Sequence, residues 1–191
     1  MTEKQVTKWL GMLCIISGVT RIGMTPSSIL WGSDSTPELL CGLIACILMS
    51  FTTLVTFTVQ AKETGVTGFI TAIAITIGNI ITTAMLWSSF ASVQPLINPD
   101  GLLFTVSRFV SLIGMTGGTL VFTFLTFRAR VYPHWVPGLL VLMLISMILP
   151  VEDNKYFAFF WGLTYVGMGY CIWADKLNRR SAIEETKSQA M

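Results

Sequence analysis

Two arginines lie inside long apolar segments, where charged side chains are rare. Arg21 lies in the stretch 8–31 and Arg108 in the stretch 101–127, and no Asp or Glu lies deep inside any apolar stretch. A guanidinium at membrane depth is costly and tends to face the interior of a helix bundle. Its fork donates two parallel hydrogen bonds to a carboxylate or a phosphate. The two residues therefore predict a pocket for an anionic group.

The two arginines are also expected at a similar depth. Arg21 follows Lys8 by about 13 residues, so a helix would raise it roughly 20 Å from that end. A hydrocarbon core of roughly 30 Å then leaves it about 10 Å from the opposite boundary. Arg108 follows Gly101 by about seven residues, which places it roughly 10 Å below the same boundary. Asn79, in the middle of the stretch 66–90, is expected only slightly deeper.

Small and polar residues recur at helical spacing around these side chains. The three stripes are Gly11, Cys14, Gly18 and Arg21; Ala72, Thr76, Asn79 and Thr83; and Arg108, Ser111, Met115 and Gly118. Such stripes mark contacts between membrane helices, because small side chains allow close approach. We expect the three helices to meet, with Arg21, Asn79, Arg108 and Ser111 facing one cavity.

The last apolar stretch carries aromatic side chains at i, i+4 and i+8. These are Phe157, Trp161 and Tyr165. They predict an aromatic wall for a hydrophobic or lipid-like ligand, and we include Trp161 and Tyr165 among the ligand-binding candidates. The structural alternatives are that the stripe is packing and that the arginines extend outward to water and lipid phosphate. The arginines could also pair with the acids Asp34, Glu38, Glu152 and Asp153.

Composition indicates a membrane protein. Hydrophobic residues make up 53% of the 191 residues and charged residues 12%, about half the roughly 25% typical of a soluble domain. The charges collect in short segments between long apolar runs, as loops alternate with spans. A net charge of +2 is too small to indicate a nucleic-acid partner. The lipid bilayer is therefore the first partner that we expect.

Cysteine and histidine usage predicts neither a disulfide framework nor a metal site. The four cysteines lie in apolar runs without a CxxC pair, and His134 is the single histidine. No HExxH, GxSxG or Walker motif is present, and the spans contain no acid that could act as a base at depth. We therefore expect no cofactor and assign no catalytic residue.

Six apolar runs have a length suited to membrane-spanning helices. They cover residues 8–31, 37–59, 66–90, 101–127, 134–150 and 156–174. Pro26 predicts that the first helix ends or kinks early, with residues 25–28 irregular. The basic start resembles that of a signal peptide, but no cleavage site with small residues follows, so we expect a retained first span.

The connecting segments alternate in charge. Basic residues gather on one side, at Lys4, Lys8, Lys62, Arg128, Arg130, Lys176, Arg179 and Arg180. The other side receives mainly acids, at Asp34, Glu38, Asp100, Glu152 and Asp153. The positive-inside rule then puts both termini in the cytoplasm. The predicted fold is an all-α bundle of six transmembrane helices over residues 1–180, with a polar cytoplasmic tail over residues 181–191.

Two strings resemble segments of a known group of proteins. "RARVYPHWVPGLLVL" (128–142) and "GLTYVGMGYCIW" (162–173) are similar to strings in six-span bacterial membrane proteins of uncharacterised function. The resemblance covers about a fifth of the chain, and the motifs are short. It implies a six-helix bundle in a bacterial cytoplasmic membrane and carries no implied activity.

Three functional interpretations follow from these features. The first is a multi-pass protein of the cell membrane that binds or transports a small anionic or amphipathic ligand through an outward-facing pocket. The second is a non-catalytic membrane subunit or an immunity-type protein that acts through a protein partner or a second copy of itself. The third is an intramembrane enzyme, which the missing acids disfavour.

Overall fold

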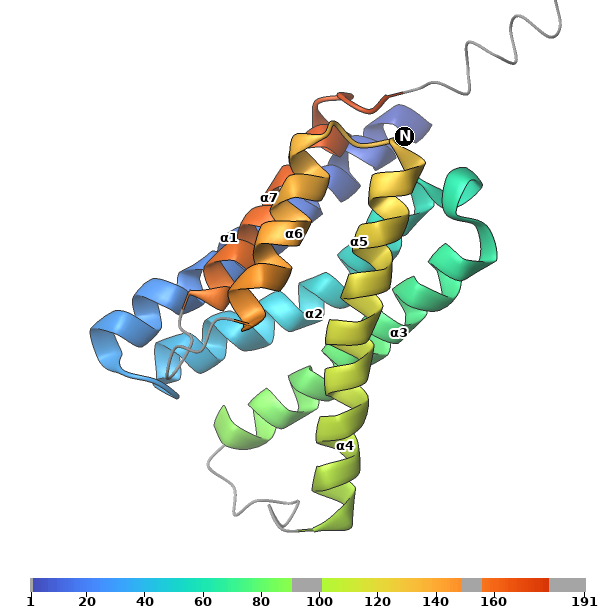
Figure 1. The fold of residues 1–191 in the computed structure, drawn as a ribbon. Coiled ribbons are helices and arrows are strands. Elements are labelled where there is room, and N and C mark those ends of the chain that lie inside the picture. Colours follow the sequence, from blue (N-terminus) through green and yellow to red (C-terminus); the bar gives the residue numbers. More distant parts are fainter. Residues whose placement is uncertain (1, 91–100, 149–155, 179–191) are drawn as a thin grey trace, which may run out of the picture.

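The computed structural model describes residues 2–90, 101–148 and 156–178, and all regular elements in these ranges are helices (Figure 1). They are α1 (Glu3–Trp31), α2 (Thr36–Thr58), α3 (Ala61–Phe90), α4 (Leu102–Leu112), the π-helix η1 (Ile113–Gly117), α5 (Gly118–Ala129), α6 (Trp135–Ile148) and α7 (Phe157–Trp173). The predicted all-α fold is confirmed for this part of the chain. The predicted tail over residues 181–191 lies outside the described residues.

Four of the helices are long and apolar enough to cross a membrane. They cover Lys4–Trp31, Thr36–Thr58, Ala61–Ser89 and Phe104–Ala129, and two shorter apolar helices cover Trp135–Met147 and Phe157–Trp173. The fourth long helix joins α4, η1 and α5 into one continuous rod (Figure 1). These apolar helices suggest a membrane-embedded protein.

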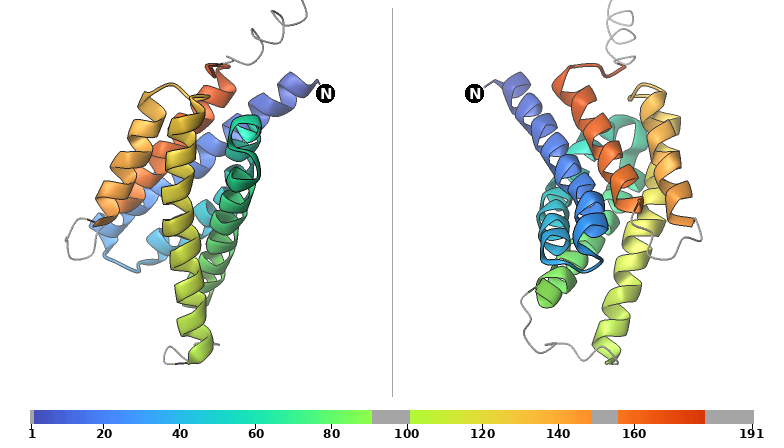
Figure 2. Two further views of the ribbon diagram at one scale, coloured as in Figure 1. Left: turned by 45° about the vertical axis from the view of Figure 1, so that its right-hand side comes forward. Right: turned by 90° about the vertical axis from the view of Figure 1, so that its left-hand side faces the viewer.

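The bundle has two ends, which the chain visits alternately. The N-terminus, the connection between α5 and α6 and the segment after α7 lie at one end, which we call the termini end (Figures 1 and 2). The turn between α1 and α2, the C-terminus of α3 and the start of α4 lie at the opposite end, which we call the turn end. Helix α1, helix α2, helix α3, the rod of α4, η1 and α5, and helix α6 therefore run in alternating directions (Figure 1).

Glycines bring α1 and α7 into close contact, and both views in Figure 2 show these helices side by side. A Cβ added at Gly18 would collide with the carbonyl oxygen of Gly162, and one at Gly169 would lie 2.7 Å from the Gly11 oxygen. Side chains larger than hydrogen do not fit between the two backbones. The small-residue stripe predicted on the first helix thus contacts the glycines of the last helix.

A second close contact joins α3 to the rod formed by α4, η1 and α5. A Cβ at Gly114 would lie 2.6 Å from the Ala74 oxygen, and one at Gly78 would lie 2.7 Å from Met115 Cγ. Gly118 meets Ile75 in the same way. The rod continues past this contact as α4, which packs against α3 and points away from α1 and α7 (Figure 1). The start of α4 therefore lies apart from α1 and α7 at the turn end.

The prediction that Pro26 interrupts the first helix is wrong. Helix α1 continues through Pro26 to Trp31. A proline removes one backbone hydrogen bond, while Thr25, Ser27 and Ser28 around it remain buried against neighbouring helices. The packing of this turn is thus kept. The irregular backbone lies instead at Gly65 in α3, whose φ of 56° is in the left-handed region that glycine adopts readily.

Candidate functional site

The turn end holds a cavity of about 430 Å³. Its walls come from the α1–α2 turn, α2, α3, α4, η1, α6 and α7, and the lining residues are Asp34, Leu39, Thr82, Met85, Leu86, Ser89, Arg108, Ser111, Leu112, Met115, Thr116, Met147, Phe157 and Trp161. Most of these side chains are apolar or thioethers. Two of them, Asp34 and Arg108, carry formal charges, and both are solvent-exposed residues. The cavity therefore combines apolar walls with a charged rim.

Arg108 reaches the cavity because α4 is held at a distance from α7. Its α4 neighbours Phe109 and Leu112 are exposed, and Ser111, one turn further along, is buried against α3. Arg108 forms no ion pair with an acid among the described residues. No described residue takes up the hydrogen-bond donors of its guanidinium, so within this part of the chain they can serve solvent or a ligand.

Three side chains from α3, α4 and η1 form a polar cluster in the cavity lining. The hydroxyl oxygens of Thr82 and Ser111 lie 2.7 Å apart, and Thr82 Oγ1 lies 3.1 Å from Met115 Sδ. Ser111 Oγ also donates to the Gly78 carbonyl oxygen at 3.4 Å. Met115 belongs to the π-helix, a backbone form that is frequent at functional sites. The cluster fixes the contact between α3 and the rod beside the cavity.

Arg21 lies behind the aromatic wall of the same cavity. Only 4% of its surface is exposed. Its Cζ lies 5.3 Å from the centre of the Phe157 ring and 5.6 Å from that of Trp161. Both aromatic residues also line the cavity, and their rings meet edge to face at 5.3 Å. Arg21 Nη1 donates to Cys46 Sγ at 3.5 Å. One aromatic pair therefore contacts both the buried cation and the cavity.

The surroundings of Arg21 leave its charge incompletely compensated. Removing an ion from water costs several kcal/mol even after relaxation. A desolvated cation–π contact returns about 2 kcal/mol, and a thiol is a weak acceptor. No acidic residue in the described part of the chain forms an ion pair with Arg21. The Nε atom of Arg21 is buried without a hydrogen-bond partner. Trp161 Nε1 is a second buried donor without a partner.

Two other predicted site residues lie outside this cavity lining. Asn79 is fully buried, and neither its amide oxygen nor its nitrogen has a partner. It precedes Thr82 by one helical turn and Leu86 by two, so it shares the face of α3 that lines the cavity. The Tyr165 hydroxyl lies 2.7 Å from Thr53 Oγ1 in the packed interior of the bundle. That contact gives Tyr165 a structural hydrogen bond.

The structure thus divides the six predicted ligand-binding residues into two groups. Arg108, Ser111 and Trp161 line the cavity, whereas Arg21, Asn79 and Tyr165 lie behind its walls. Comparison of the chain with protein-family models, curated proteins and solved structures gives no match.

Sequence reasoning missed several contacts of the site. Cys46 accepts the hydrogen bond of Arg21, and Asp34 lines the cavity without pairing with either arginine. Glu38 accepts a hydrogen bond from the Asp34 backbone at 2.8 Å. Cys46 recurs with Met49 and Thr53 at helical spacing on the buried face of α2. This spacing could have placed it inside the bundle, but it does not show which helix lies opposite.

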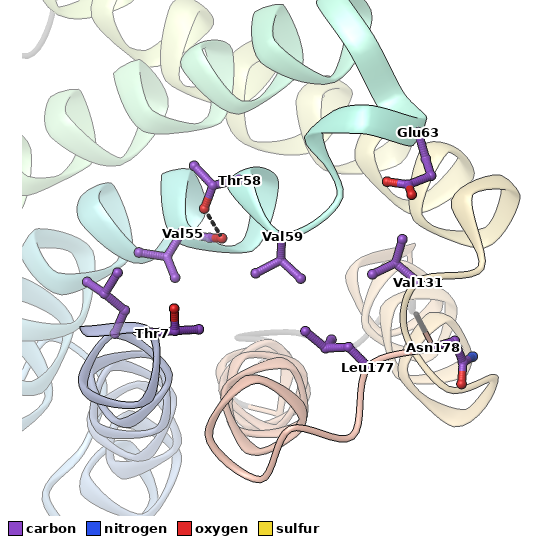
Figure 3. Close-up of a pocket in the computed structure, with 9 residues that line it drawn as sticks. Thr7, Val55, Thr58, Val59, Glu63, Val131, Leu177 and Asn178 are labelled. Atoms are coloured by element: carbon purple, nitrogen blue, oxygen red, sulfur yellow. Dashed lines mark hydrogen bonds between the residues drawn. The ribbon is translucent and has the colours of Figure 1, made fainter. Parts of the chain in front are cut away.

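A second cavity, of about 320 Å³, lies at the termini end (Figure 3). Its lining residues are Thr7, Leu10, Val55, Thr58, Val59, Glu63, Val131, Leu177 and Asn178. Figure 3 shows Val59, Val131 and Leu177 around the opening, with Glu63 at its edge. Among the described lining residues, Glu63 is the only charged one, so none of them offers a cation to an anionic ligand.

Proposed function

We propose that the chain is a six-span protein of the cell membrane, with both termini in the cytoplasm, that binds or transports a small anionic or amphipathic molecule. The ligand would enter the cavity at the turn end, which then faces outward. The observation that carries this proposal is the cavity itself, with Arg108 at the rim of apolar walls. Its volume, about 430 Å³, lies within the range of roughly 300–1,000 Å³ typical of ligand pockets.

The membrane part of the proposal is supported by the outer surface of the helices. Large apolar side chains on several helices are exposed, among them Phe51, Phe69, Phe109, Phe124 and Phe127. A monomeric soluble protein rarely exposes so much apolar surface. The basic connecting segments gather at the termini end, which supports a cytoplasmic position for that end.

Topology can be tested by labelling single cysteines in a background that lacks the four native ones. The two variants are Ser33→Cys, in the turn between α1 and α2, and His134→Cys, between α5 and α6. Both positions are exposed. In intact cells, an impermeant maleimide should label position 33 readily and position 134 only after permeabilisation. Equal labelling of both positions in intact cells would contradict the proposed topology.

The ligand part of the proposal is supported by the division of the cavity lining. Arg108 offers donors for a carboxylate or a phosphate, and Leu39, Leu86 and Met115 offer apolar contact to the remainder of a ligand. An anion without an apolar body would leave these walls unused, and an alkyl chain without an anionic head would leave the guanidinium unused. An amphipathic anion fits both.

Binding can be measured as thermal stabilisation of the purified protein in an uncharged maltoside detergent. The probes are decanoate and decyl phosphate, with decanol as the uncharged analogue. Arg108→Lys should weaken binding of both anions although the charge is kept, because an ammonium lacks the bidentate fork. Arg108→Gln should weaken it further, by roughly tenfold or more in all. Decanol binding should change little.

Arg128→Lys provides the matched control, because Arg128 lies in the last turn of α5 at the termini end. It should bind the anions like the wild type. If no probe stabilises the wild-type protein, or if Arg108→Lys matches it throughout, the proposed role of Arg108 is wrong. In that case Arg108 is a residue that extends outward to water and lipid phosphate.

A further inference from the structure

We propose that Arg21 and Trp161 form a deep anion subsite, in which Arg21 Nε and Trp161 Nε1 donate hydrogen bonds to one carboxylate or phosphate group of the ligand. The inference rests on the proposed function of the cavity and deepens it. Arg108 would bind the anionic head group at the rim of the cavity, and the deep subsite would bind the same head group in a second, deeper position.

The first argument concerns the chemistry of the two unpartnered groups. Arg21 is 4% exposed and Trp161 1% exposed, and the named nitrogens of both are buried without a hydrogen-bond partner. A guanidinium and an indole N–H donate and do not accept. The group that satisfies them must therefore be an acceptor. The positive charge of Arg21 further favours an acceptor that is an anion.

The second argument concerns access. Phe157 and Trp161 contact the Arg21 guanidinium and also line the 430 Å³ cavity. Two aromatic side chains thus stand between the cavity and the cation, with no intervening helix. Phe157 is only half-buried, and side chains that reach the surface change rotamer much faster than a ligand binds. A shift of the Phe157 ring, which lies 5.3 Å from Arg21 Cζ, would open Arg21 to a head group that already occupies the cavity.

The third argument excludes the nearby side chains as counter-charges. Cys46 accepts one hydrogen bond from Arg21 Nη1, but a thiol sulfur is a weak acceptor. Asp34 lines the cavity and makes no ion pair with Arg21. The aromatic rings attract the cation through their faces and carry no charge. Within the described residues, the charge of Arg21 therefore has no anionic partner.

The surroundings of the subsite define the ligand class. Leu86, Met115 and Met147 line the same cavity as the aromatic pair, so the anionic head would carry an apolar chain. Such a molecule can be a free single-chain amphiphile or an anionic phospholipid of the bilayer. Both share a carboxylate or phosphate head joined to alkyl carbon, and the test below separates them.

The experiment compares Trp161→Phe and Arg21→Lys with the wild type. Trp161→Phe keeps an aromatic ring and removes the Nε1 donor, and Arg21→Lys keeps the charge and removes the Nε donor. The control variants are Trp173→Phe, at the far end of α7, and Arg128→Lys. The affinity of decyl phosphate, decanol, inorganic phosphate and dioleoyl phosphatidate is determined from thermal stabilisation in maltoside micelles. Trp161→Phe serves alone if Arg21→Lys does not fold.

We expect each site variant to weaken decyl phosphate binding roughly tenfold and to leave decanol binding within about twofold, because each removes one charge-assisted or buried hydrogen bond. The controls should match the wild type. Stronger stabilisation by phosphatidate than by decyl phosphate identifies a phospholipid ligand, and the reverse identifies a free amphiphile. Inorganic phosphate should bind far more weakly than either.

The experiment can refute the deep subsite without refuting the proposed function of the cavity. If Arg108→Gln weakens decyl phosphate binding while Trp161→Phe and Arg21→Lys bind it like the wild type, the deep subsite is wrong and the proposed function stands. The subsite is also overturned if Trp161→Phe loses decanol and decyl phosphate equally, because the indole then contributes only apolar contact. If no probe binds the wild type, both proposals are wrong.

Discussion

The interior of this bundle satisfies its polar groups in one region and leaves them unpartnered in another. In the seam between α1, α2 and α7, Ser17 lies 3.3 Å from the Thr52 hydroxyl and Thr53 lies 2.7 Å from that of Tyr165. Beside the cavity at the turn end, Arg21 and Trp161 each keep a buried donor without a partner. The same three helices run through both regions, so the difference comes from which side chains they bring together.

Outside the cavity region, the described residues include one buried amide that is only half satisfied. Gln60, near the termini end, donates from Nε2 to Thr126 Oγ1 at 3.0 Å, but its Oε1 has no partner. One neutral amide that is half satisfied costs far less than a buried cation. The unpartnered charge is therefore the feature that separates the cavity region from the seam.

The largest expected effect comes from filling the close contact in the seam. Gly162→Ala should lower the free energy of unfolding by about 1–3 kcal/mol, because the new methyl would collide with the Gly18 oxygen and lie 2.8 Å from the Ile22 nitrogen. Gly138→Ala in α6 is the matched control, since nothing lies within 4 Å of its Cβ position. Higher helix propensity should make that variant slightly more stable. Denaturant unfolding in detergent measures both, and equal effects would argue against a closed seam.

The next effect should have the opposite sign. Asn79→Leu replaces a buried amide whose two polar atoms have no partner. Because such a group costs about 1–3 kcal/mol while it is unpartnered, the variant should be more stable by about 1–2 kcal/mol. The same unfolding measurement applies. A loss of stability would show that Asn79 has hydrogen-bond partners in the folded protein, and the contrast between the two regions would then be weaker.

A smaller loss is expected when one hydroxyl is removed from the seam. Tyr165→Phe breaks the 2.7 Å contact with Thr53, whose hydroxyl keeps its bond to the Met49 carbonyl at 2.7 Å. Since Thr53 stays satisfied, we expect a loss of about 0.5–1 kcal/mol. An unchanged affinity for decyl phosphate in the same variant would separate the seam from the cavity. A tenfold loss of affinity would instead support the prediction that Tyr165 is a ligand-binding residue.

The smallest effect should lie outside both regions. The Tyr170 hydroxyl accepts a 2.7 Å hydrogen bond from Lys176 Nζ, and this bond raises the pKa of Lys176. Because Lys176 is fully exposed, the bond competes with water, and Tyr170→Phe should change the melting temperature by no more than about 1 °C. A larger shift would mean that the segment after α7 contributes to the stability of the termini end of the bundle.

The helices could be predicted from the sequence because each one is an apolar run of sufficient length. The runs 37–59 and 156–174 match α2 and α7 to within one residue at each end. The glycine stripe of the first helix also correctly indicated a close contact. The expected partners, the helices over residues 66–90 and 101–127, were wrong, because α1 packs against α7 and α2. Helical spacing shows which residues share a face and leaves open which helix lies opposite.

The site was predicted in part for the same reason. Depth and spacing brought Arg21 and Arg108 to the same end of the bundle, but the two have opposite environments, one buried and one exposed. That difference arises because Phe157 and Trp161 of α7 cover Arg21. Helix α4, in contrast, points away from α7 (Figure 1). The angle at which helices cross depends on contacts distant in the sequence, such as Gly114 against Ala74.

The π-helix at Ile113–Gly117 changes the rotational register within the continuous helical rod of α4, η1 and α5. Its wider hydrogen-bonded ring holds one residue more than an α-helical ring, and one residue corresponds to about 100° of rotation. Arg108 and Gly118 lie on either side of the π-helix and can therefore face different neighbouring helices. Deleting a single residue here would shorten the rod by only about 1.5 Å, yet it would turn Arg108 about a quarter of a circle relative to the glycine contact. Chain length at this point thus sets the direction in which the charge is presented.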